Sequence, residues 1–207
     1  MCPVPVPLGA LRTKRLVGRT REREAIKAAI EAEDELRVIH IIGGGGIGKT
    51  RLLEAIPEEI LLTCSNKDRC QWGGIFDLYH TDIHTNSGIE AAILRALDAD
   101  GFKEYREKRA EYEKLRRAGG DPKLLEELRE ELWKLFVKGF NEITAQTRVI
   151  LCFDTVELIQ YESDMVQEVC GIEYGGVEVR EWLKTVIPQL KNAVVIFAGR
   201  PKPQLWG

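Results

Sequence analysis

Between residues 43 and 50 the chain reads Gly43-Gly44-Gly45-Gly46-Ile47-Gly48-Lys49-Thr50, and this stretch decides the fold. It fits the pattern G-x-x-x-x-G-K-S/T, in which glycines let backbone N–H groups approach phosphate oxygens closely. Lys49 is expected to neutralise the β- and γ-phosphates of a nucleoside triphosphate, and Thr50 to offer its hydroxyl to Mg²⁺. We therefore predict that residues 43–51, with Arg51 as the last, bind a nucleotide.

The sequence on either side of this loop predicts a strand before it and a helix after it. Val38 to Ile42 is a short apolar run rich in β-branched residues, which is typical of a strand buried on both faces. A helix is expected from Lys49 to Ile56, closed near Pro57. A second strand is expected from Ile75 to Tyr79, after the turn-like Trp72-Gly73-Gly74.

Strand and helix patterns continue to alternate along the chain. Val149 to Phe153 and Val194 to Ala198 are further buried-strand patterns. Helices are expected after a capping Thr20, after a capping box formed by Ser87 and Glu90, and near residues 177–187. This order predicts a three-layer α/β/α P-loop NTPase fold with a mainly parallel sheet.

A helical hairpin is expected as an insertion at about residues 102–138. Gly119-Gly120 stops its first helix, and Asp121-Pro122 starts its second as cap and first helical residue. Both a partner-binding coiled coil and a solvated insertion fit this pattern. We divide the chain into an N-terminal arm, 1–16, and a P-loop ATPase core, 17–207, which we expect to be truncated at its C-terminus.

An acidic residue follows the third strand pattern directly. Asp154 closes the run from Val149 to Phe153, so it is expected at the carboxyl edge of the sheet, on the Mg²⁺ side of the nucleotide. Thr155 comes next, so Glu157 is the nearest candidate for a base that orients water, although it also fits a solvated helix residue.

Composition limits the classes of protein to which the chain can belong. It has 207 residues, of which 44% are hydrophobic and 30% charged, and no run of eighteen apolar residues. Together with the lack of a secretory signal, this predicts a cytoplasmic protein that does not span a membrane. A formal net charge of −3 provides no global attraction for nucleic acid, and the five cysteines are expected to be reduced thiols.

The sequence resembles the signal-transduction ATPases with numerous domains (STAND), a branch of P-loop ATPases close to the AAA+ and origin-recognition ATPases. The resemblance covers most of the chain. It rests on Val17-Gly18-Arg19 with Glu22 and Glu24, the loop from Gly43 to Thr50, the strand that ends at Asp154, and the strand that ends Ala198-Gly199-Arg200-Pro201.

This resemblance implies several properties. Val17, Gly18 and Arg19 would lie near the adenine and ribose, and Arg200 would sense the γ-phosphate. The resemblance alone favours ATP over GTP. It also implies a nucleotide-dependent switch in a larger signalling or defence protein, self-association of that protein when ATP is bound, and C-terminal sensor or repeat domains beyond this segment.

One departure from the related families concerns turnover. Many AAA+ relatives carry a glutamate directly after the Mg²⁺-binding aspartate, where this chain has Thr155. We therefore expect slow ATP hydrolysis. Two alternatives stay open at this stage, an AAA+ or origin-recognition-like ATPase that acts on DNA and a nucleotide-locked structural module without turnover.

Overall fold

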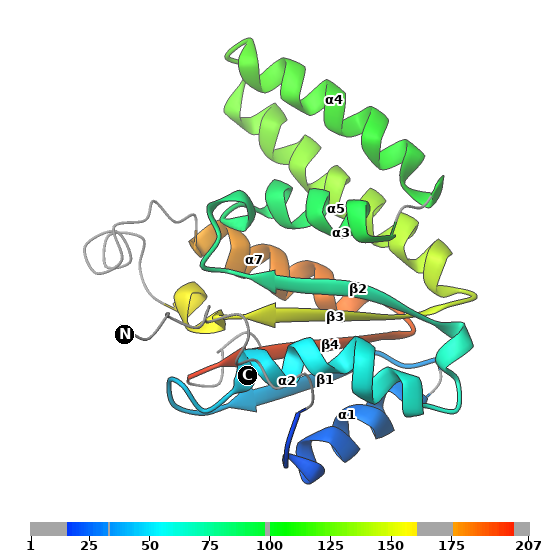
Figure 1. Ribbon diagram of the computed structural model, residues 1–207. Coiled ribbons are helices and arrows are strands. Elements are labelled where there is room, and N and C mark those ends of the chain that lie inside the picture. The colour runs from blue at the N-terminus through cyan, green and yellow to red at the C-terminus, as the bar shows by residue number, and fades with distance from the viewer. Residues whose placement is uncertain (1–15, 33, 98–99, 161–175, 201–207) are drawn as a thin grey trace, which may run out of the picture.

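A four-stranded parallel sheet forms the centre of the molecule (Figure 1). The computed structural model describes residues 16–32, 34–97, 100–160 and 176–200. The strands occur in the spatial order β1-β4-β3-β2, and the predicted parallel α/β fold is confirmed. Their bounds are β1 Arg37–Ile42, β2 Cys70–Asp77, β3 Arg148–Asp154 and β4 Ala193–Gly199.

Helices cover both faces of this sheet (Figure 1). One face carries α1 (Thr20–Glu31) and α2 (Lys49–Ala55), and the other carries α3 (Asn86–Leu97), α5 (Pro122–Thr144) and α7 (Gly176–Val186). Every residue of β3 and β4 is buried, and alternate side chains enter two separate apolar cores. This explains why both strands read as continuous apolar runs.

Short helical turns connect these elements. They are η2 (Ile56–Ile60), η3 (Leu61–Thr63), η4 (Lys67–Arg69), η5 (Thr81–Ile83), η6 (Asp100–Phe102), η7 (Val156–Gln160) and η8 (Ile187–Gln189).

The expected hairpin is formed by α4 (Lys103–Arg117) and α5, and its free end projects from the body of the protein (Figure 1). Asp121 caps α5 as predicted, because its carboxylate accepts a 2.8 Å hydrogen bond from the backbone N–H of Lys123. However, α5 continues to Thr144, beyond the expected end near residue 138. The extra turns bury Gly139, Phe140 and Thr144.

The predicted turn at Trp72-Gly73-Gly74 is wrong. These residues lie inside β2, where the pairing with β3 shifts register between Trp72 and Gly74. A Cβ atom at Gly73 would lie 2.5 Å from the Leu151 Cδ2 atom and 3.0 Å from the Ile150 carbonyl oxygen, so a larger residue would have to displace its neighbours on β3. As a result β2 starts at Cys70 and ends at Asp77, not at Tyr79.

Two predicted helix starts also need correction. Thr20 is the first residue of α1 rather than its cap, which is Arg19 in a left-handed conformation with φ 58°. At α3, the Thr85 hydroxyl accepts a 3.1 Å hydrogen bond from the Gly88 N–H, so Thr85 performs the capping expected of Ser87. The capping box is wrong because the Glu90 side chain is buried in the core instead.

The prediction that the first strand is buried on both faces is wrong as well. Among the described residues β1 pairs only with β4, so it lies at an edge of the sheet, and Ile41 is its one buried residue. The helix after the loop ends at Ala55, and the π-helical turn η2, which contains Pro57, follows it.

Cys64, Cys70 and Cys152 are free thiols, while Cys2 and Cys170 lie outside the described residues. No helix in the described part of the chain is long and apolar enough to cross a membrane.

A buried carboxylate joins the hairpin to the rest of the core. The Glu90 side chain on α3 accepts hydrogen bonds from Tyr105 Oη on α4 at 2.6 Å and from Trp182 Nε1 on α7 at 2.8 Å. The Arg109 guanidinium lies 3.7 Å from the same carboxylate. Burial raises the pKa of Glu90 above its ordinary value. The hydrogen bonds from Tyr105 and Trp182 and the charge of Arg109 lower this pKa by a smaller amount.

This raised pKa predicts how the Glu90→Gln substitution changes stability with pH. The folded state holds the Glu90 proton more tightly than the unfolded state, so the wild type loses stability as pH rises from the unfolded to the folded pKa. Glutamine does not titrate. The variant should therefore not show this loss of stability. Between the unfolded and the folded pKa of Glu90, the unfolding free energy of Glu90→Gln minus that of the wild type should rise with pH, by at most about 1.4 kcal/mol per pH unit.

Urea unfolding across a pH series measures this difference, with Glu130→Gln, which changes an exposed carboxyl on α5, as the matched control. A difference for Glu90→Gln that stays constant with pH would contradict the prediction.

Candidate nucleotide-binding site

The glycine-rich loop follows the carboxyl end of β1 and leads into α2. Gly46 and Gly48 have φ angles of 75° and 86°, a left-handed conformation that residues with a Cβ atom rarely adopt. The N–H of Gly43 donates a 3.1 Å hydrogen bond to the carbonyl of Gly199, the last residue of β4. The loop is thereby fixed over the adjacent ends of β1 and β4.

Lys49 directs its ammonium group back into this loop. Its Nζ donates hydrogen bonds of 2.9 Å to the carbonyl oxygens of both Gly43 and Gly44. The positive charge is thus held within the turn that the motif assigns to phosphate binding.

Thr50 and Asp154, the two residues predicted to face Mg²⁺, contact each other. The Thr50 hydroxyl donates a 2.5 Å hydrogen bond to Asp154 Oδ2, across 104 residues of sequence. Asp154 ends β3 and is only 4% exposed. A hydroxyl and a carboxylate are hard oxygen donors, which suit a Mg²⁺ ion that also binds phosphate oxygens. The donor set therefore fits this ion, and its role here stays a prediction.

Arg200 and Glu157 form a second pair beside the loop. Glu157 Oε2 accepts a 3.2 Å hydrogen bond from the Arg200 N–H, and Glu157 Oε1 lies 3.5 Å from Arg200 Nε. A Cβ atom at Gly45 would lie 3.3 Å from Arg200 Nη2, so the guanidinium is next to the loop. Arg200 is 67% exposed and Glu157 only 15%. The position of Arg200 is compatible with γ-phosphate sensing, and Glu157 anchors it.

The sequence also predicted nucleotide contacts for Arg19, Arg51, Val17 and Gly18. The Arg19 guanidinium donates to the Ile47 carbonyl of the loop and to Glu22 Oε1, so the structure brings Arg19 to the site. The Arg51 guanidinium lies 3.6 Å from Glu54 Oε2 and 3.7 Å from Glu59 Oε1, so it pairs with carboxylates of α2 and η2. Its contact with the nucleotide stays a prediction. Val17 is 86% exposed, and Gly18 lines a pocket of about 310 Å³ between α1 and η2–η3. Their contact with adenine stays a prediction.

The sequence analysis missed Asp77 at this site and predicted no contact for the Thr155 side chain. Asp77 and Asp154 are register partners at the ends of β2 and β3. The hydroxyl of Thr155 donates a 2.6 Å hydrogen bond to Asp77 Oδ1. An aspartate after a strand pattern is the signal that could have found Asp77, but the expected end of that strand at Tyr79 concealed it.

Comparison with known proteins gives a family and a likeness to solved structures. Residues 15–168 match the family model described as an AAA ATPase domain. The chain is similar to the Aeropyrum pernix ORC2 protein solved as ADPNP–ADP complexes, with 14% identity, a TM-score of 0.47, and coverage of 90% of this chain and 42% of that one. It thus spans less than half the length of that protein. The search of curated proteins finds no match.

The loop glycines provide a test of the backbone geometry. A Cβ atom would meet nothing within 4 Å at either Gly46 or Gly44, but only Gly46 has a left-handed φ. Gly46→Ala should lower the free energy of unfolding by about 1–2 kcal/mol. Gly44→Ala should leave it unchanged or raise it by up to about 1 kcal/mol. Urea unfolding without nucleotide measures both, and equal losses would show that the loop has a different conformation.

Proposed function

Since the chain belongs to the AAA ATPase domain family, we propose that it binds ATP with Mg²⁺ and hydrolyses the nucleotide slowly. The observation that carries this proposal is the hydrogen bond between Thr50 and Asp154 beside a glycine loop that already holds the Lys49 ammonium. These groups supply the positive charge, the backbone donors and the oxygen ligands that a Mg²⁺-bound triphosphate requires.

Each residue has a defined task in this proposal. Lys49 exchanges its two loop carbonyls for phosphate oxygens, and the loop N–H groups bind the remaining oxygens. Thr50 and Asp154 hold Mg²⁺, directly or through water. The ion, when bound, neutralises charge on the phosphates. In this proposal Arg200 contacts the γ-phosphate, which its position next to Gly45 and its contacts with Glu157 support.

We further propose that this domain acts as a switch within a larger cytoplasmic protein of the STAND type. Loss of the γ-phosphate removes charge-assisted contacts to Lys49 and Arg200, which changes the balance between conformations of neighbouring segments. The STAND assignment rests on the sequence resemblance, as do self-association in the ATP-bound form and the existence of C-terminal sensor domains.

An ATPase that acts on DNA is the second candidate, because AAA ATPase domain membership accommodates it equally well. The net charge of −3 gives this chain no general attraction for DNA. Titration with duplex DNA over a range of salt concentrations, with ATP turnover followed in parallel, separates the two candidates. Salt-sensitive binding that accelerates turnover would favour the DNA role.

The central proposal predicts that Lys49→Ala loses ATP binding. Removing the ammonium removes two charge-assisted contacts to phosphate, so affinity should fall by at least about 100-fold. Calorimetric titration with ATP, GTP and a non-hydrolysable ATP analogue in Mg²⁺ measures this. Lys67→Ala, at an exposed residue on η4, is the matched control and should bind like the wild type.

Absence of ATP binding by the wild type, or equal affinities of the wild type and Lys49→Ala, would refute the assignment of the phosphate site.

A further inference from the structure

A second carboxylate lies beside Asp154 at the carboxyl edge of the sheet. Asp77 is the last residue of β2, and its Cα is the register partner of the Cα of Asp154 on β3. Neighbouring strands are about 4.8 Å apart, so the two aspartates leave the sheet side by side. Strand carboxyl ends are where α/β sheets bind ligands.

Hydrogen bonds connect this second carboxylate to the phosphate loop. Thr50 Oγ1 donates to Asp154 Oδ2, and Asp154 Oδ1 accepts a 2.9 Å hydrogen bond from the Thr155 N–H. Thr155 Oγ1 then donates to Asp77 Oδ1 at 2.6 Å. A continuous row of polar groups therefore runs from the loop residue Thr50 across β3 to Asp77.

The backbone of Thr155, which lies between Asp154 and Asp77 in this row, has a strained conformation. Its φ angle is 57°, and among the non-glycine residues with positive φ in the described ranges it is the only β-branched one. A β-branched side chain in this region is a conformational outlier, and such outliers concentrate at functional sites. Here the strained residue is the one that bonds both aspartates.

The Glu157 carboxylate, which also lies near the loop, already contacts Arg200. Glu157 Oε2 accepts from the Arg200 N–H and Oε1 faces the Arg200 guanidinium. Asp77 Oδ2, in contrast, lies 3.9 Å from His80 Nε2, and one-third of the Asp77 side chain is exposed. The Asp77 side chain can therefore be reached by water.

We propose that Asp77 orients the water molecule that attacks the γ-phosphate of ATP, with Thr155 as the residue that positions Asp77. The inference rests on the proposed function. Asp77 then supplies the carboxylate that the position after Asp154 lacks, from the neighbouring strand.

The proposed reaction is the attack of this water molecule on the γ-phosphate of ATP. The water oxygen forms a bond to the γ-phosphorus, and the bond between that phosphorus and the β–γ bridging oxygen breaks, so ADP leaves with the electron pair. One water proton passes through Asp77 Oδ2 to the released phosphate. No other reactant is needed.

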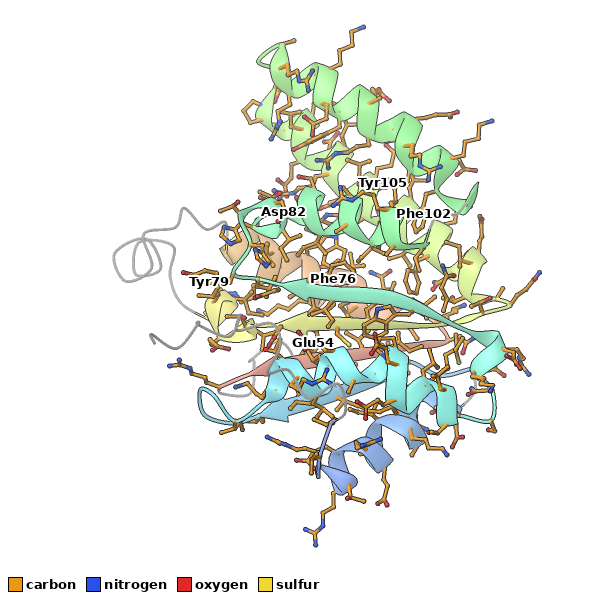
Figure 2. All side chains as sticks on the ribbon, viewed as in Figure 1. Glu54, Phe76, Tyr79, Asp82, Phe102 and Tyr105 are labelled. Carbon is orange, nitrogen blue, oxygen red and sulfur yellow. The ribbon has the colours of Figure 1, made fainter. Side chains whose placement is uncertain are left out.

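The simpler interpretation is that Asp77 only shapes the turn after β2. Its Oδ1 accepts a 3.0 Å hydrogen bond from the Tyr79 N–H as well as the bond from Thr155. Figure 2 shows Tyr79 just past the end of β2, with Asp82 farther along, near the start of α3. An asparagine at position 77 keeps a carbonyl oxygen for both bonds, but it replaces the charged second oxygen with an NH₂ group that cannot accept a proton from water. Asp77→Asn therefore separates the structural role from the chemical one.

The experiment measures ATP affinity, single-turnover hydrolysis at saturating Mg²⁺ and thermal unfolding for the same set of variants. Asp77→Asn should bind ATP within about threefold of the wild type, unfold at the same temperature, and hydrolyse at least about 100-fold more slowly. Thr155→Val should also slow hydrolysis, whereas Thr155→Ser, which keeps the hydroxyl, should restore it. Asp82→Asn removes the same charge nearby and should behave like the wild type.

The outcomes separate this inference from the proposed function. If the wild type binds and hydrolyses ATP and Asp77→Asn keeps the wild-type rate, the inference alone is overturned. It is also overturned if only Glu157→Gln abolishes turnover. If the wild type binds ATP without hydrolysing it, the inference fails together with the hydrolysis part of the proposed function. If the wild type does not bind ATP, both proposals fail.

Discussion

The hydrogen bond between Thr50 and Asp154 is the interaction on which the site depends. It joins the first turn of α2 to the end of β3, although β4 lies between β1 and β3 in the sheet. Such a contact requires β1 and β3 to end at the same edge of the sheet, and a parallel sheet provides this. Asp154 is buried, so the bond also satisfies a carboxylate that would otherwise be costly to remove from water. Fold and site are therefore stabilised by the same contact.

The parts of the fold that could be predicted are those set by local pattern. β3 and β4 are buried on both faces, so an unbroken apolar run identified them. In β1 the same kind of run was misleading, because a strand's position in the sheet depends on chain topology and not on its own residues. Gly73 looked like part of a turn, but it lies inside β2, close to Leu151 of the neighbouring strand β3, which is distant in the sequence. Glu90 fitted a capping box, yet its partners lie 15 and 92 residues away.

Within the site, too, residues that belong to a local sequence pattern could be predicted, and residues that depend on the arrangement of the strands could not. Gly43 to Thr50 is a contiguous motif whose chemistry follows from its residue types, and Asp154 was found because it ends a clear strand pattern. Asp77 could not be placed in the same way, since its importance comes from the register between β2 and β3. The Glu157–Arg200 pair also needed the fold, because it joins residues 43 positions apart. The sequence thus predicted the loop and Asp154, but not the hydrogen bonds that continue from Asp154 through Thr155 to Asp77.

The packing behind the site connects it to the hairpin. A Cβ atom at Gly199 would lie 2.6 Å from Val156 Cγ2, so the end of β4 and the start of η7 are in close contact. η7 carries Glu157, the anchor of Arg200, and packs against α7. Trp182 on α7 in turn shares the Glu90 carboxylate with Tyr105 on the hairpin. Close-packed interiors do not deform continuously, so a displacement of η7 has to be accommodated by α7 and, through Glu90, by the base of the hairpin.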